Sequence, residues 1–148
     1  MALTDETITT LTEAISKIIE SSLTELVLKR LGSFGYEPTE DDVFAIGFSV
    51  QKVEQTIKND CNVTEVPEGL TSIAVDMVCG EFLSTKYRTG QLVLSSLDLD
   101  GALASVNVGG ASVSFDNNTS DDSKLNTLVS LLVNSGRGEF ACYRKIKW

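Results

Sequence analysis

One stretch of the chain, residues 70 to 87, limits the possible folds more than any other. Its sequence, LTSIAVDMVCGEFLSTKY, is apolar around most of the circumference that a helix presents. A helix of this kind is buried at the centre of a domain, so other helices must pack around it. Pro67 suits the first position of such a helix, and Gly80 in its middle costs about 1 kcal/mol relative to alanine. A close approach by a neighbouring helix at Gly80 is the expected compensation.

Three further segments place apolar residues at steps of three and four, which is the spacing of an amphipathic helix. They cover residues 5 to 31, 39 to 59 and 120 to 134, and polar turn residues or glycines separate them. Together with residues 70 to 87 they predict a mostly α fold, a small helical bundle of about four helices. A chain of 148 residues can build one real core, so we expect a single domain over residues 1 to 148.

A short β-hairpin is the one expected departure from helical structure. Residues 106 to 115, VNVGGASVSF, alternate apolar and polar side chains on either side of a Gly-Gly step. Two strands alone are marginal in water, so this hairpin must lean on the helices or be extended by a neighbouring copy. We expect it to be an insertion in the bundle whose apolar face contacts a neighbour, with the residues Val106, Val108, Val113 and Phe115 on that face.

The charges of the chain are divided unevenly between a body and a tail. The chain has 12 basic and 21 acidic residues, of which residues 137 to 148 hold four basic residues and one acidic residue. The tail therefore carries 4 − 1 = +3, and the body carries 8 − 20 = −12. Such a body repels nucleic acid and lacks the basic surface of a DNA-reading protein, although a need for solubility alone also explains it.

The tail, residues 137 to 148, also has the composition of an interaction segment. Tyrosine, arginine and tryptophan are the residue types most enriched at interface hot spots, and the tail follows a glycine-rich break that allows it to project. We predict an extended tail that contacts a neighbouring protein, although Trp148 could instead fold back over its own domain. The residues expected at this contact are Tyr143, Arg144, Lys145, Ile146 and Trp148.

The sequence does not predict an enzyme. Nucleophile–base chemistry usually needs histidine as the proton carrier, and the chain contains none. The carboxylate pairs Asp41-Asp42 and Asp121-Asp122 stand at predicted helix starts, where capping explains them. We therefore expect no catalytic residue.

No metal or cofactor is expected either. The segment Asp98 to Gly101 lacks the further oxygen ligands of a calcium loop. The three scattered cysteines, Cys61, Cys79 and Cys142, form no Cys-x-x-Cys pair, so we interpret them as reduced thiols.

No apolar run approaches the roughly 18 residues of a membrane span, and the N-terminus has no secretion-signal pattern. The expected site of synthesis is the host cytoplasm, with no membrane contact.

Two carboxylates interrupt the central apolar segment. Asp76 and Glu81 either lie on its narrow polar face or pair with a basic residue, since an unpaired charge in a core is costly. Candidate partners are Arg88 and a tail arginine, from the same subunit or an adjacent one. These residues therefore stand as possible intersubunit ion pairs.

Three segments together resemble a known family. They are residues 66 to 83 (VPEGLTSIAVDMVCGEFL), the hairpin that ends at residues 112 to 115 (SVSF) and the closing residues 143 to 148 (YRKIKW). In this order they are similar to the head-tail connector, or head-completion, proteins of long-tailed bacteriophages and of prophages in Gram-positive bacteria. The long first helix departs from this pattern, so the resemblance implies no role for residues 1 to 35.

The resemblance implies a structural adaptor in the neck of a virion. Such proteins form a homo-oligomeric ring of about twelve copies beneath the portal protein of the viral capsid. The ring extends the channel for DNA, which passes without sequence-specific binding, and it offers a platform to a tail or stopper protein. The alternative that the composition leaves open is a small acidic regulatory or inhibitor protein that binds a basic protein surface, with its carboxylates gathered on one exposed face.

Overall fold

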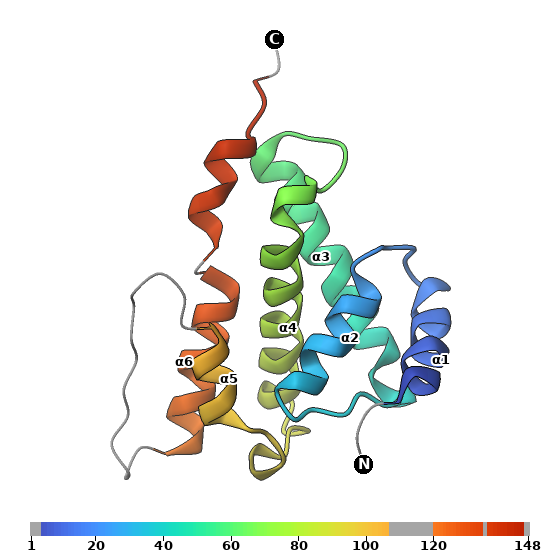
Figure 1. The fold of residues 1–148 in the computed structure, drawn as a ribbon, viewed down its shortest axis with the longest axis vertical. Coiled ribbons are helices and arrows are strands. Elements are labelled where there is room, and N and C mark those ends of the chain that lie inside the picture. The colour runs from blue at the N-terminus through green and yellow to red at the C-terminus, as the bar shows by residue number, and fades with distance from the viewer. Residues whose placement is uncertain (1–3, 107–119, 135, 147–148) are drawn as a thin grey trace.

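The computed structural model describes residues 4–106, 120–134 and 136–146, and in these residues the chain forms six α-helices and no strand (Figure 1). Helix α4 (Thr71–Arg88) stands at the centre and packs against α6 (Asp121–Asn134), α3 (Val43–Cys61) and α2 (Thr24–Ser33). The predicted helical bundle and its central helix are therefore confirmed for this part of the chain. The buried side chains of α4 include Ala74, Val75, Met77, Val78, Cys79, Phe82 and Leu83.

Gly80 marks the close contact between α4 and α6. A Cβ atom at this position would lie 2.7 Å from Cγ2 of Val133 and 3.0 Å from Cβ of Leu132. The absence of a side chain lets the two helices approach, which offsets the low helix propensity of glycine. The expected close approach at Gly80 is confirmed.

The prediction of one helix over residues 5 to 31 is wrong. The segment forms α1 (Asp5–Ser16) and α2 (Thr24–Ser33), which pack on each other and place α1 against α3. The Ser21 hydroxyl accepts a hydrogen bond from the Leu23 amide at 3.1 Å and donates one to Glu54 of α3. Serine hydroxyls compete with helical backbone bonds, and the turn lets both halves bury their apolar stripes. The repeat of apolar residues continues through the turn, so the spacing alone did not show it.

The start of α3 agrees with the sequence signals, while Pro67 stands just before the first turn that leads into α4 and not at the first helical position. Thr39 and Asp42 form a reciprocal capping box around the short 3₁₀ turn η1 (Glu40–Asp42), which continues into α3. A second 3₁₀ turn, η2 (Glu68–Leu70), leads from Pro67 into α4. Helix α3 ends at Asn62, whose φ of 56° is the left-handed conformation common after helix ends.

Helix α5 (Leu99–Val106) was not expected from the sequence. Asp98 caps it, because its Oδ1 accepts from the Gly101 amide at 3.1 Å, and Leu99, Ala102 and Leu103 are buried where α5 packs on α6. Val106 is the last residue of this helix, so its assignment to a strand is wrong. The rest of the predicted hairpin, with Val108, Val113 and Phe115, lies outside the described residues.

The remaining described elements are the 3₁₀ turns η3 (Leu94–Ser96) and η4 (Arg137–Tyr143). In residues 4–106, 120–134 and 136–146, no helix combines the length and apolar character that crossing a membrane requires.

Candidate functional site

The C-terminal segment is fixed to the domain before it projects. At Gly136 the chain passes close to α4, where a Cβ atom would lie 2.6 Å from Cγ2 of Ile73. The 3₁₀ turn η4 then buries Phe140, whose carbonyl oxygen lies 3.7 Å from the Cys61 sulfur. Tyr143 packs over Gly69, where a Cβ atom would overlap its hydroxyl group. Residues 137 to 143 are therefore part of the domain surface and are not an extended tail.

The projecting part of the chain begins at Arg144. The Lys145 amide donates to the Cys61 carbonyl at 2.8 Å, and its own carbonyl accepts from Nδ2 of Asn62 at 3.0 Å. These two bonds tie the backbone to the end of α3, while the side chains of Arg144 and Lys145 remain exposed. Ile146 is 78% exposed, and Figure 1 shows the chain leaving the domain at this end. We call residues 144 to 148 the C-terminal arm; Lys147 and Trp148 lie outside the described residues.

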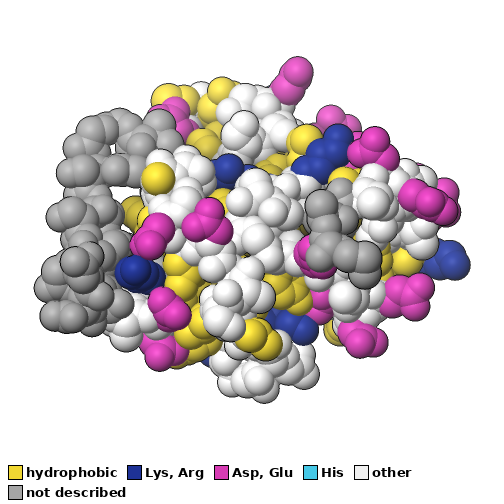
Figure 2. Space-filling view, turned by 60° about the horizontal axis from the view of Figure 1, so that its bottom comes forward, with side chains coloured by type: hydrophobic (Ala, Val, Ile, Leu, Met, Phe, Trp, Pro, Cys, Tyr) yellow, Lys and Arg dark blue, Asp and Glu magenta, His cyan; other side chains and the backbone are white. Residues whose placement is uncertain are grey.

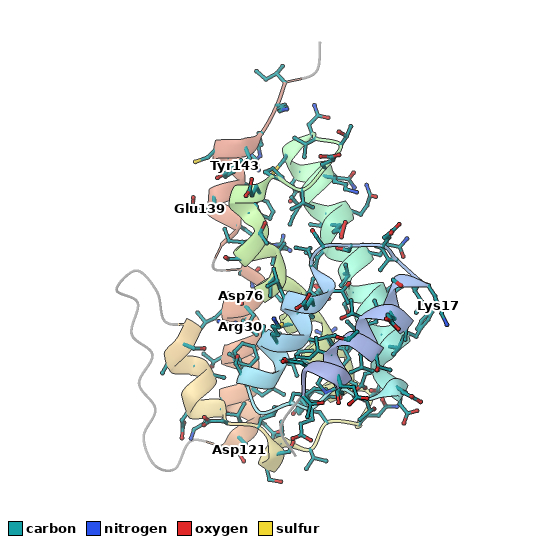
Figure 3. The ribbon with its side chains drawn as sticks, turned by 45° about the vertical axis from the view of Figure 1, so that its right-hand side comes forward. Lys17, Arg30, Asp76, Asp121, Glu139 and Tyr143 are labelled. Atoms are coloured by element: carbon teal, nitrogen blue, oxygen red, sulfur yellow. The ribbon has the colours of Figure 1, made fainter. Side chains whose placement is uncertain are left out.

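Asp76 and Glu81 both have partners within the chain. Nε of Arg30 on α2 lies 2.9 Å from Oδ1 of Asp76, and Figure 3 shows the two residues facing each other. Nζ of Lys52 on α3 lies 3.1 Å from Oε2 of Glu81. The partners are thus Arg30 and Lys52 and not Arg88 or a tail arginine. Arg88 is exposed at the end of α4.

The Arg30–Asp76 pair lies in an open groove between α2 and the first turns of α4. The groove has a volume of about 520 Å³, and its wall combines the aliphatic side chains of Leu26 and Val75 with the hydroxyls of Thr71 and Ser72. Burial raises the pKa of Asp76, and the guanidinium of Arg30 opposes this shift. This ion pair orients α2 on α4, and the carboxylate of Asp76 is bound by the guanidinium of Arg30.

A second carboxylate, Asp42, is almost fully buried where α3 begins. Its Oδ2 accepts from the Tyr36 hydroxyl at 2.7 Å and from the Thr39 amide at 3.1 Å, while Nζ of Lys86 lies 2.8 Å from its Oδ1. Burial and the bond to Asp42 raise the pKa of Tyr36 well above its usual value. The Tyr36 ring also packs edge-on against Phe82. This cluster joins the start of α3 to the end of α4.

The carboxylate pair at the start of α6 also has a local structural role. Asp121 and Asp122 lie in the first turn of α6, where the Ser120 hydroxyl caps the Ser123 amide at 3.2 Å. Asp122 accepts from the Tyr87 hydroxyl at 2.6 Å, which raises the pKa of Tyr87. The interpretation of these acids as helix-start residues is therefore confirmed.

Cys61, Cys79 and Cys142 are all unpaired thiols, and the described residues contain no cluster of three side chains suited to hold a metal ion.

An exposed aromatic pair on α3 was missed at the sequence level. Phe44 is 70% exposed and Phe48 is 55% exposed, and their rings stack with centroids 6.3 Å apart. The buried stripe of α3 runs through Ile46, Val50 and Val53, so these two phenylalanines fall on the opposite side. Two large aromatics at positions i and i+4 outside a buried stripe are the signal that could have revealed them.

No protein-family model, curated protein or solved structure matches the chain. The proposed function therefore rests on the arrangement of the chain's own residues and on the resemblance of its sequence segments.

Proposed function

We propose that this protein is a structural assembly subunit, a head-tail connector that forms a ring beneath the portal of a bacteriophage capsid. The observation that carries the proposal is the described part of the C-terminal arm, residues 144 to 146, which leaves the domain with basic side chains and an Ile146 that is 78% exposed. An exposed aliphatic residue on a projecting segment gains free energy when a second surface covers it. The resemblance of three sequence segments to connector proteins names the kind of partner.

The charge distribution supports the same proposal. A body of −12 is suited to a channel through which DNA must slide without sticking, and the +3 arm is suited to an acidic neighbour. On the face shown in Figure 2, Asp and Glu side chains are separated by uncharged groups and by Lys and Arg. An inhibitor that imitates nucleic acid would gather its carboxylates in one field, so this face favours the connector over that alternative.

If the proposal is correct, a gene for a portal protein lies beside the gene for this chain, and its product is the partner used in the test. The two purified proteins are mixed and followed by size-exclusion chromatography with light scattering, and we expect one complex that contains a portal ring and several copies of this chain. The variant Arg144→Glu/Lys145→Glu should lose the complex. The control Lys17→Glu/Lys29→Glu makes the same charge change on exposed residues far from the arm and should keep it. Failure of the unmodified chain to join the portal at any concentration would refute the proposal.

A further inference from the structure

The N-terminal half of α3 presents a surface that its own domain does not cover. Phe44 and Phe48 stack on it, and the exposed positions that follow on the same side are Gln51 and Gln55. Water-exposed phenylalanine pairs are costly unless a partner removes them from solvent. We call this surface the α3 aromatic face.

Acidic side chains border the α3 aromatic face. Glu40 and Asp41 are exposed and precede Phe44 by four and three positions, so they lie near it on the same side. Lys52, at the other end of the face, is paired with Glu81 at 3.1 Å. A partner for this face should therefore combine apolar side chains with positive charge.

The C-terminal arm of this chain has that composition. Arg144, Lys145 and Lys147 carry +3, and Ile146 and Trp148 are apolar. The described part of the arm exposes Ile146 while its backbone is held at Lys145. The arm and the α3 aromatic face are thus complementary in both charge and polarity.

The arm of one chain cannot reach Phe44 or Phe48 on the α3 aromatic face of the same chain. Lys145 is bonded to Cys61 at the end of α3, and Phe44 lies 61 − 44 = 17 positions earlier, which is about 26 Å along the helix axis. The three residues after Lys145 span about 11 Å when fully extended. Figure 1 shows the last described residues of the chain and the start of α3 at opposite ends of the molecule. A contact between arm and face therefore requires a second copy.

From this complementarity and this separation, we infer that the C-terminal arm of one copy docks on the α3 aromatic face of the next copy. The inference rests on the proposed self-assembly and specifies its contact. Because the two surfaces differ, the contact is heterologous, and its repetition closes a ring or continues as a filament. The contact is small beside the roughly 1,200 Å² of a standard stable interface, so each pairwise contact is weak and closure of the ring stabilises it.

Two variants of the full chain separate the arm from the face. The arm variant is Ile146→Asp/Trp148→Ala, and the face variant is Phe44→Ser/Phe48→Ser. Each removes apolar side chains from one surface and retains the other surface, and circular dichroism verifies that both still fold. A third variant, Val93→Ser, serves as the matched control, because Val93 is 63% exposed but lies outside both surfaces.

Sedimentation velocity at high protein concentration gives the first readout. We expect the unmodified chain and Val93→Ser to self-associate, and each test variant alone to lose about tenfold or more in association constant. An equimolar mixture of the two test variants should form a dimer and nothing larger, because one intact arm meets one intact face. A mixture that behaves like either variant alone would overturn the inference.

A spin label on Cys142 gives the position of the contact. Cys142 is the exposed thiol next to the arm, while Cys61 and Cys79 are buried, so a maleimide label attaches there. The labelled face variant is added to ¹⁵N-labelled arm variant in which Cys142 is changed to serine. Broadening of amide signals from Val43 to Gln51 is expected, and broadening elsewhere or none would overturn the docking. If copies of this chain still form a ring on the portal when the contact between arm and face is removed, only the inference fails. If that contact forms but the chain does not bind the portal, only the connector function fails.

Discussion

Nζ of Lys86, near the end of α4, lies 2.8 Å from Oδ1 of Asp42, a carboxylate that is only 2% exposed at the start of α3. The two residues are 44 positions apart in the sequence, and their pairing fixes how the two longest helices meet. The same carboxylate accepts from the Thr39 amide in the capping box of η1 and from the Tyr36 hydroxyl. The pair is therefore a structural junction of the bundle.

Replacing Asp42 by alanine should destabilise the fold by about 3 kcal/mol, because it leaves Lys86 without its counter-charge and removes one half of the capping box that precedes α3. Urea unfolding at neutral pH measures this loss. The control Glu25→Ala breaks an exposed helical pair with Lys29 and should cost less than about 0.5 kcal/mol. Equal effects of the two substitutions would show that the buried pair has no special structural role.

The contact at Gly80 gives a second test. Gly80→Val should destabilise the protein by about 2 kcal/mol, since the new side chain overlaps Val133 and Leu132 of α6. Thermal or urea unfolding measures this loss of stability. Gly138→Ala is the control, because a Cβ at Gly138 meets nothing within 4 Å. Adding Val133→Ala to Gly80→Val should restore part of the loss, and no restoration would contradict the assigned overlap.

The cysteines should differ in reactivity. Burial raises the pKa of both the Cys61 and Cys79 thiols, while Cys142 is exposed. A thiol reagent at neutral pH should therefore modify one cysteine in the folded protein and all three after unfolding. Mass spectrometry of the modified chain identifies the site. Rapid modification of Cys79 in the folded state would contradict the packing of α4.

Asp76 should give the stability a characteristic pH dependence. Burial raises its pKa in the folded protein above the unfolded value of about 3.9, so the folded state binds more protons just above that pH. Its contribution to stability is therefore greatest at low pH and falls as pH rises through the folded pKa. Relative to Asp76→Asn, the unmodified chain should lose free energy of unfolding as pH rises from about 4. An increase with pH in the free energy of unfolding of the unmodified chain, relative to that of Asp76→Asn, would contradict this prediction.

The sequence predicted those parts of the fold that local patterns determine. The apolar circumference of residues 70 to 87 identified α4, Gly80 identified the close approach of a neighbouring helix, and Thr39 with Asp42 identified the start of α3. The turn between α1 and α2 was missed, because one apolar repeat runs through both helices. Helix α5 was missed because it is only eight residues long and contains Gly101.

The partners of charged residues depended on tertiary structure. A basic partner was one of the two expectations for Asp76, but Arg30 is 46 positions away and enters through the packing of α2, which local spacing cannot reveal. The arm was predicted from composition, yet its starting point at Arg144 follows from the burial of Phe140 and the bonds of Lys145. The exposure of Phe44 and Phe48 became evident once the buried side of α3 was known.

Negative-stain electron microscopy of this chain mixed with the proposed portal partner tests the connector function most directly. We predict a portal particle with an added ring of density on one face, made of several copies of this chain around a central channel. The face variant should leave bare portal particles under the same conditions. Bare portals with the unmodified chain, at concentrations well above those at which the chain associates with itself, would contradict the connector function.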